Sequence, residues 1–125
     1  DLNSSPEYFY FAEAFDMSGG VAAIDSISQG KKFPRAIVCG SDEVAIGVLS
    51  ALNKRNIRVP EEVAVIGMDN IEMSEYTNPP LTTMNVQKKN MGARAVEMIV
   101  NNTCDQGENA IRIMLPANII NRGSC

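Results

Sequence analysis

One carboxylate, that of Asp69, stands three residues beyond the most uniformly apolar run of the chain, Val63 to Ile66. Gly67 follows this run and permits a sharp turn of the backbone. A short run of this kind is typical of a strand buried on both faces in a parallel sheet. Because ligands of open α/β sheets bind outside the carboxyl ends of the strands, we expect Asp69 to face a ligand. An ionised carboxylate there can accept charge-assisted hydrogen bonds.

Two further side chains follow strand-like runs in the same way. Phe15 lies beyond the aromatic run Glu7 to Ala12, and Ser41 lies beyond Arg35 to Cys39. If the three runs are parallel strands, Phe15, Ser41 and Asp69 meet at one edge of the sheet. An aromatic face covers the apolar face of a sugar or a base, so this combination suits such ligands. Each residue also has a structural alternative: Asp69 could cap a loop, Phe15 could belong to the core, and Ser41 could cap a helix, alone or together with a ligand contact.

Two helices are predicted between these strands. The first spans about 17–29 and is capped by Asp16. The second begins after Ser41, has acidic residues in its first turn, and ends before Asn56, which is expected to adopt a left-handed conformation. Asp42 is interpreted as a helix-terminus residue rather than a ligand contact. Strand, helix, strand, helix and strand in this order form a right-handed parallel α/β unit.

The remainder of the chain uses the same two kinds of element. A β-like run, Leu81 to Val86, precedes a helix predicted from Lys88 to about Asn101. Two short strands are predicted after this helix, at Ile111 to Leu115 and at Asn118 to Arg122. The expected fold class is therefore α/β with a parallel sheet.

Composition narrows the class of function. The 125 residues carry a net charge of −4 and a pI near 4.8, which argues against a nucleic-acid surface on this chain. The chain has no histidine, so a histidine triad or a histidine metal cluster is excluded, and neither a metal nor a cofactor is expected. Its three cysteines are widely spaced, which fits a reducing cytoplasm better than a disulfide framework. The sequence has no apolar run of membrane-spanning length, and its first residues do not resemble a signal peptide.

Five stretches of the chain together resemble the effector-binding region of LacI/GalR-type bacterial transcriptional repressors. They stand in that family's order and spacing across nearly the whole chain. The stretches are Ala36–Gly47, Val59–Asn70, Pro80–Thr83, Met91–Ala95 and Ile120–Ser124. The resemblance implies a periplasmic-binding-protein-like fold of type I, in which two α/β subdomains joined by three crossovers close over a small ligand. This chain matches the second half of that region.

The resemblance also implies a division of the chain. Residues 1–80 would form the C-terminal subdomain, residues 81–117 a crossover and part of the N-terminal subdomain, and residues 118–125 the return to the C-terminal subdomain. Operator DNA would be bound only through a helix-turn-helix that this chain lacks, and one half of the cleft should bind effector weakly. The family further implies a homodimer, with Tyr76 and the helix at 42–56 at the interface.

Ligand-binding roles follow from the resemblance, position by position. Phe15 falls where an aromatic ring often lies against the ligand, and Asp69 falls where an acid often accepts hydrogen bonds from it. Val38 would line the pocket floor, and Gln87 would lie on a crossover near the cleft. Ser41 departs from the family, in which many members carry Asn, because it offers one hydroxyl in place of an amide. The implied ligand is a sugar, a sugar phosphate or a purine-like molecule.

The expected function is effector sensing by part of a bacterial LacI-type transcriptional regulator in the cytoplasm, without catalysis. Effector would bind one closure state better than the other and thereby control DNA binding. A periplasmic sugar-binding protein of a transport system has the same fold and is the main alternative. An enzyme acting on phosphosugars or nucleotides is a third class, but the sequence shows no glycine-rich phosphate loop and no evident nucleophile–base pair.

Overall fold

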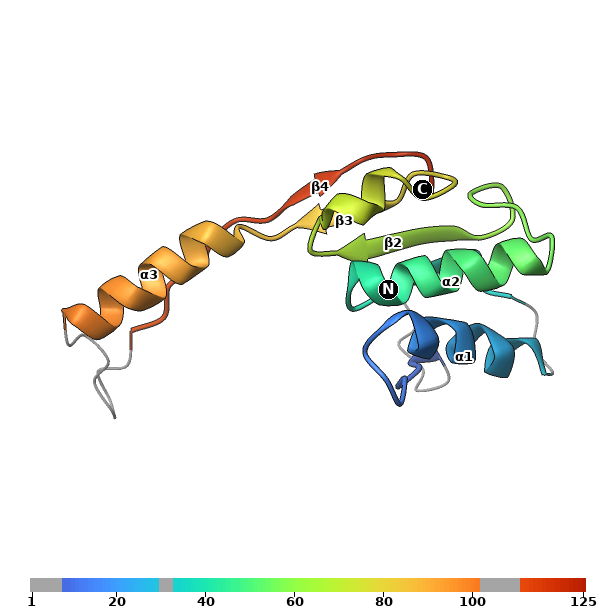
Figure 1. The fold of residues 1–125 in the computed structure, drawn as a ribbon, viewed down its shortest axis with the longest axis horizontal. Helices are drawn as coiled ribbons and strands as arrows, with labels where there is room; N and C mark the ends of the chain where they lie inside the picture. The colour runs from blue at the N-terminus through green and yellow to red at the C-terminus, as the bar shows by residue number, and fades with distance from the viewer. Residues whose placement is uncertain (1–7, 30–32, 102–110) are drawn as a thin grey trace.

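The described strands form one mixed sheet in the order β1–β2–β3–β4 (Figure 1). The computed structural model describes residues 8–29, 33–101 and 111–125. The strands are β1 (Ala36–Val38), β2 (Ala64–Met68), β3 (Thr82–Asn85) and β4 (Asn118–Ile120). β2 pairs in parallel with β1 and with β3, whereas β4 is antiparallel to β3. The expected α/β class with a parallel sheet through β2 is therefore confirmed, with one antiparallel strand at its edge.

Two helices lie on one side of this sheet. The helical elements are α1 (Met17–Ser28), α2 (Asp42–Lys54), the short 3₁₀ helix η2 (Glu72–Glu75) and α3 (Lys88–Val100). α2 packs against β2, and α1 packs against α2 (Figure 1). The predicted cap at the start of α1 is confirmed, because the Asp16 carboxylate accepts hydrogen bonds from the first N–H groups of that helix. The predicted left-handed residue after α2 is also confirmed, because Asn56 has a φ of 57°.

The apolar core lies between α1, α2 and the sheet. Its buried members are Ile24, Cys39, Val44, Ala45, Val48, Leu49, Ala51, Leu52, Val63, Val65 and Leu81. Burial alternates along β2, with Val65 fully buried while Ile66 on the opposite face is only partly covered. The expectation that β2 is buried on both faces is therefore only half met, because α2 covers one face.

Two predicted strands are wrong. Tyr8 to Ala12, the described part of the aromatic run, forms no strand, and neither does Ile111 to Leu115. A strand is stable only when its backbone N–H and C=O groups pair with a neighbouring strand. Neither segment pairs with a strand in the described part of the chain, so side-chain pattern alone does not produce a ladder. Glu7, where the first prediction began, lies outside the described residues.

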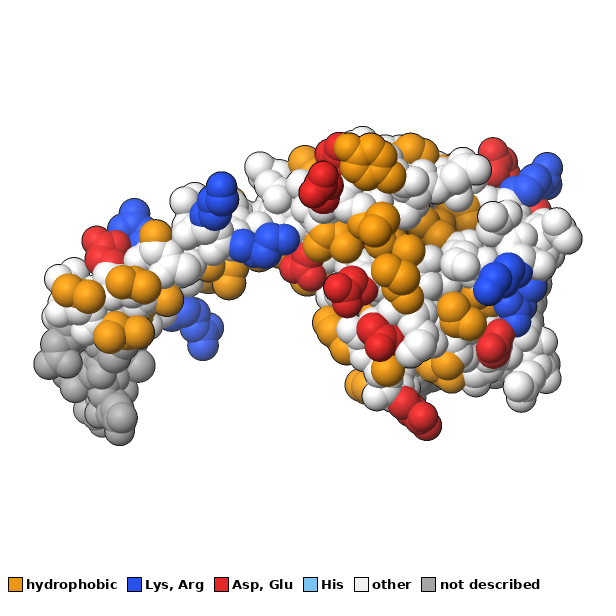
Figure 2. All heavy atoms as spheres, in the orientation of Figure 1, with side chains coloured by type: hydrophobic (Ala, Val, Ile, Leu, Met, Phe, Trp, Pro, Cys, Tyr) orange, Lys and Arg blue, Asp and Glu red, His pale blue; other side chains and the backbone are white. Residues whose placement is uncertain are grey.

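β3 and β4 lead into an arm that projects from the body of the molecule (Figure 1). The arm contains α3, none of whose residues is buried. Its apolar side chains Val96, Ile99 and Val100 are all exposed, and Figure 2 shows hydrophobic atoms over its surface. A helix of this composition normally buries an apolar stripe against another element. The assignment of residues 81–117 to a crossover and part of a second subdomain stays a prediction.

Glycines allow α1 and α2 to approach each other closely. A Cβ atom at Gly20 of α1 would lie 2.1 Å from the backbone oxygen of Val44 in α2. A Cβ at Gly47 of α2 would lie 2.1 Å from the backbone oxygen of Met17. Because both neighbours are backbone atoms, a side chain at either position would force the helices apart.

The first prediction concerns this helix contact. Gly20→Ala should destabilise the protein by about 1–3 kcal/mol, the usual cost of overpacking a core. The measurement is the urea midpoint of unfolding. Gly92→Ala is the matched control: Gly92 lies in exposed α3 with no atom within 4 Å of an added Cβ, so stability should be unchanged or slightly higher. Equal midpoints for the two variants would contradict the close packing of α1 on α2.

The second prediction concerns the start of α2. The Ser41 hydroxyl accepts a hydrogen bond from the Val44 N–H at 3.2 Å and caps the helix. Ser41→Ala should therefore cost about 1 kcal/mol of stability. Ser28→Ala is the control, because the exposed Ser28 hydroxyl only donates to the Asp25 backbone oxygen at the far end of α1. A loss no larger for Ser41→Ala than for Ser28→Ala in the same urea experiment would rule out the cap as a source of stability.

Candidate ligand-binding site

The carboxyl ends of the parallel strands meet at one edge of the sheet. In the register of β1 and β2, Val38 lies opposite Ile66, and the following N–H of Cys39 donates to the Ile66 oxygen at 2.9 Å. In the register of β2 and β3, the Asp69 N–H donates to the Met84 oxygen at 2.9 Å. The pairing therefore places the residues that follow β1, β2 and β3 along a common edge.

The sequence predicted that Phe15 follows a strand. It instead reaches this edge from the loop before α1. A Cβ placed at Gly40 would lie 3.0 Å from Cε2 of the Phe15 ring, so the ring lies directly against the segment that follows β1. Phe15 is 70% exposed and Val38 is 79% exposed. Together with Tyr10 and Phe11 they line a mainly apolar hollow of about 290 Å³. This hollow offers a surface for the flat or apolar part of a ligand.

Asp69 presents an unpartnered carboxylate at the same edge. Its side chain is half-buried, and no hydrogen bond or ion pair to that carboxylate is found within the described ranges. Its backbone has a φ of 109°, and that of Asn70 has a φ of 49°, both in the left-handed region. The Lys88 ammonium group donates to the Asp69 backbone oxygen, so a cation lies near this turn. A free anionic acceptor and a nearby cationic donor suit a polar ligand.

The side chains of Ser41 and Gln87 form hydrogen bonds within the protein. Ser41 is only 5% exposed, and its oxygen accepts the capping hydrogen bond of α2, which confirms the helix-cap alternative. The Gln87 amide donates to the Pro116 oxygen at 2.9 Å and accepts from the Asn90 amide at 2.6 Å. Gln87 therefore ties the two segments of the arm together at its base. A ligand contact by either residue stays a prediction.

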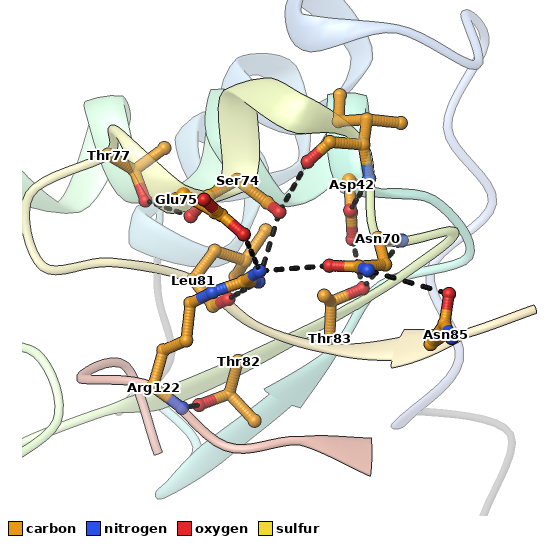
Figure 3. Close-up of polar contacts among 11 residues, drawn as sticks. Asp42, Asn70, Ser74, Glu75, Thr77, Leu81, Thr82, Thr83, Asn85 and Arg122 are labelled. Atoms are coloured by element: carbon orange, nitrogen blue, oxygen red, sulfur yellow. Dashed lines mark hydrogen bonds and ion pairs between the residues drawn. The ribbon is translucent and has the colours of Figure 1, made fainter. Parts of the chain in front are cut away.

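Asp42 was not predicted to matter beyond the helix terminus. It is fully buried, its carboxylate accepts a hydrogen bond from the Thr83 hydroxyl at 2.5 Å, and it accepts another from the Ile71 N–H at 2.8 Å (Figure 3). Gly67 leaves room for this carboxylate, because a Cβ there would lie 2.2 Å from an Asp42 carboxylate oxygen.

Arg122 is the second functional candidate that sequence reasoning missed. Its guanidinium donates to the side chains of Asn70 and Glu75, each at 2.9 Å, and to the Ser74 hydroxyl at 3.1 Å (Figure 3). A fourth hydrogen bond reaches the Leu81 backbone oxygen at 2.9 Å. Although Arg122 belongs to a stretch that resembles the LacI/GalR family, nothing in the local pattern indicates these distant partners.

Cys39 lies beneath the apolar hollow. Burial and, to a smaller extent, the nearby Asp42 carboxylate together raise the pKa of its thiol to about 12. The thiol therefore stays protonated at neutral pH and acts as a small apolar side chain.

A larger hollow of about 480 Å³ lies at the opposite end of the molecule, beyond the start of β2. It is lined by the C-terminal end of α2 and the segments around Arg58 and Asn78. It touches none of the five predicted site residues. Because the unpartnered Asp69 carboxylate and the exposed Phe15 ring stand at the carboxyl edge, we place the candidate ligand site there.

Neither a metal-binding cluster nor a membrane-spanning helix is found within residues 8–29, 33–101 and 111–125. No three His, Cys, Asp or Glu side chains gather there as they would around a metal ion. No helix in those ranges has both the length and the apolar character needed to cross a membrane.

Comparison with known proteins identifies the family. A family model described as a periplasmic binding protein-like domain matches residues 2–125. The HTH-type transcriptional repressor PurR of Vibrio atlanticus is 39% identical over 92 residues, which are 74% of this chain and 28% of that protein. The chain thus spans little more than a quarter of that curated relative.

Solved structures agree with this result. The LacI-type transcription regulator of Bifidobacterium animalis has a TM-score of 0.78 at 31% identity, covering 91% of this chain and 41% of that one. The LacI family transcriptional regulator of Lactobacillus casei with bound sucrose has a TM-score of 0.72 at 26% identity, covering 88% and 41%. The chain therefore belongs to the periplasmic binding protein-like domain family, as an effector-binding region of the LacI type.

Proposed function

We propose that this chain senses a small effector for a LacI-type transcriptional regulator. The effector binds at the carboxyl edge of the sheet, against Phe15 and Val38, with Asp69 as the main hydrogen-bond acceptor. Ser41 and Gln87 border the same cleft. The observation that carries the proposal is that the unpartnered Asp69 carboxylate and the exposed Phe15 ring both lie at the carboxyl edge of the sheet, in a chain of this family.

The chemistry of the edge favours a sugar, a sugar phosphate or a purine-like ligand. A carboxylate can accept from two adjacent hydroxyl groups or from ring N–H groups, and such charge-assisted hydrogen bonds are strong. The Phe15 ring and Val38 would cover the apolar face of the same molecule. The Lys88 ammonium group, held on the Asp69 backbone oxygen, would favour electron-rich groups on the ligand. The related regulator from Lactobacillus casei was solved with bound sucrose, which supports this ligand class.

In the proposed regulator, DNA binding is a function of a part of the intact protein outside this chain. Operator DNA would be bound by a helix-turn-helix outside this chain, as the name of the related repressor suggests. Effector binding would stabilise one closure of the two subdomains, residues 81–117 belonging to the crossover and the second subdomain, and so change DNA affinity. We further propose a cytoplasmic homodimer without catalytic activity, with the exposed Tyr76 at its interface. The transport-protein alternative is disfavoured, because the relatives found are transcriptional regulators.

The third prediction tests the role of Asp69. A thermal-shift screen of sugars, sugar phosphates and purine bases is run on the intact protein. A compound at about 100 times its dissociation constant should add about 2.7 kcal/mol of stability. Asp69→Gly should raise the dissociation constant of that compound about tenfold to a hundredfold, since a hydrogen bond to a charged group contributes about 1.5–3 kcal/mol.

Glycine is the informative replacement, because it adopts the φ of 109° at this position without strain while removing the carboxylate. The unliganded variant should therefore remain folded. Glu61→Gln is the matched control: Glu61 is exposed at the opposite end of the sheet, and its loss should leave the ligand-induced shift unchanged. The proposal is wrong if no compound in the panel shifts the melting temperature, or if Asp69→Gly retains the full shift.

A further inference from the structure

The turn at residues 69–71, called the ligand turn here, has every one of its backbone N–H groups bonded. The first donates to the Met84 oxygen at 2.9 Å, the second to the Thr83 hydroxyl at 3.2 Å, and the third to the Asp42 carboxylate at 2.8 Å. Two of these acceptors belong to β3 and the third begins α2. Each residue of the turn is therefore hydrogen-bonded through its N–H to an acceptor elsewhere in the fold.

This external hold is physically required. The first two residues of the ligand turn, Asp69 and Asn70, both have positive φ without being glycine. Such conformations are costly and persist only where the surrounding structure holds them. The three N–H bonds supply that hold and fix the backbone from which the Asp69 side chain projects.

Thr83 is the centre of the arrangement. Its hydroxyl donates to the Asp42 carboxylate at 2.5 Å and accepts from the second N–H of the ligand turn, and both Thr83 and Asp42 are fully buried (Figure 3). A hydroxyl has one proton to donate and two lone pairs to accept, so it satisfies both neighbours at once. Without it, a buried carboxylate oxygen and a turn N–H would both lose a partner.

Arg122 holds the ligand turn from the other connection to the arm. It follows β4, its side chain is 11% exposed, and its guanidinium donates to the Asn70 side-chain oxygen at 2.9 Å. Its own backbone N–H donates to the Thr82 hydroxyl in β3 at 2.9 Å. The guanidinium also bonds Glu75 and Ser74 of η2, so its position is fixed from several directions.

We infer that Asp42, Thr83 and Arg122 are positioning residues that set the pose of Asp69 and couple it to both connections between body and arm. The inference rests on the proposed function in one respect, namely that Asp69 contacts the effector. The arm is joined to the body through β3 and β4, so a movement of the arm would shift both strands. Thr83 in β3 and Arg122 after β4 both bond Asn70 of the ligand turn. An effector that favours one pose of Asp69 therefore favours one placement of the arm.

The fourth prediction uses two substitutions at Thr83. Thr83→Val keeps the shape but removes the hydroxyl, whereas Thr83→Ser keeps the hydroxyl. Residue-by-residue amide hydrogen exchange is measured by NMR on the intact protein. In Thr83→Val the Asn70 and Ile71 amides should exchange at least about tenfold faster, because breaking one such hydrogen bond changes the opening equilibrium by about 1.4 kcal/mol or more. The Val65 amide in β2 should keep its rate, and Thr83→Ser should retain slow exchange at the turn.

Arg122→Lys is a second, milder variant in case Thr83→Val fails to fold. Lysine keeps the charge but cannot reach several acceptors in the fixed geometry of a guanidinium. Exchange at Asn70 should again accelerate while the Ala64 amide of β2, which donates to the Arg35 oxygen, is unaffected. Uniform acceleration of Asn70 and Ala64 would indicate a general loss of stability and overturn the positioning role, as would unchanged exchange at the turn.

The same variants are then tested with the panel of sugars, sugar phosphates and purine bases. Thr83→Val should reduce the ligand-induced thermal shift, and Thr83→Ser should preserve it. The exchange measurement needs no ligand, so it tests the positioning role of Thr83 independently of the proposal that Asp69 contacts the effector. Normal turn exchange in Thr83→Val overturns the positioning network even where Asp69→Gly abolishes binding. Accelerated turn exchange together with full binding by Asp69→Gly supports the network and overturns the ligand role of Asp69.

Discussion

The buried carboxylate of Asp42 joins three parts of the molecule that are distant in sequence. Asp42 is the first residue of α2, and its carboxylate accepts hydrogen bonds from the Thr83 hydroxyl in β3 and from the Ile71 N–H after β2. An isolated buried charge is very costly, and these hydrogen bonds together with the N-terminus of α2 offset that cost. Removing the carboxylate would leave a buried hydroxyl and an N–H without their acceptor. Gly67 leaves the space that this arrangement occupies, because a side chain there would collide with the Asp42 carboxylate.

Features that depend on neighbouring residues could be predicted from the sequence. The bounds of α2, its Ser41 cap and the left-handed Asn56 each follow from residues within one or two helical turns. The role of Asp42 could not be predicted, because an acid in the first turn of a helix is common and its partners lie far along the chain. The same holds for Arg122, whose acceptors lie in β3, in η2, at Asn70 and at Leu81.

The geometry of the sheet edge could be predicted from the sequence, whereas the hydrogen bonds made by its polar side chains could not. Parallel pairing brings Val38 and Asp69 to one edge as expected, whereas Phe15 arrives there from a loop, since the run before it finds no partner strand. Residue type alone could not predict which of these polar side chains would lack a hydrogen-bond partner within the protein. The Ser41 oxygen accepts from the Val44 N–H and the Gln87 amide bonds residues at the base of the arm, whereas the Asp69 carboxylate has no partner within the described residues.

The most direct test of the ligand site is to locate the ligand. Amide and side-chain chemical shifts of the isotope-labelled intact protein are followed by NMR while the strongest stabilising compound of the panel is added. The proposed site predicts the largest changes at Phe15, Val38 and the 69–71 turn, at the carboxyl edge of the sheet. Changes concentrated around Asn56 and Asn78, which line the larger hollow at the opposite end, would contradict it.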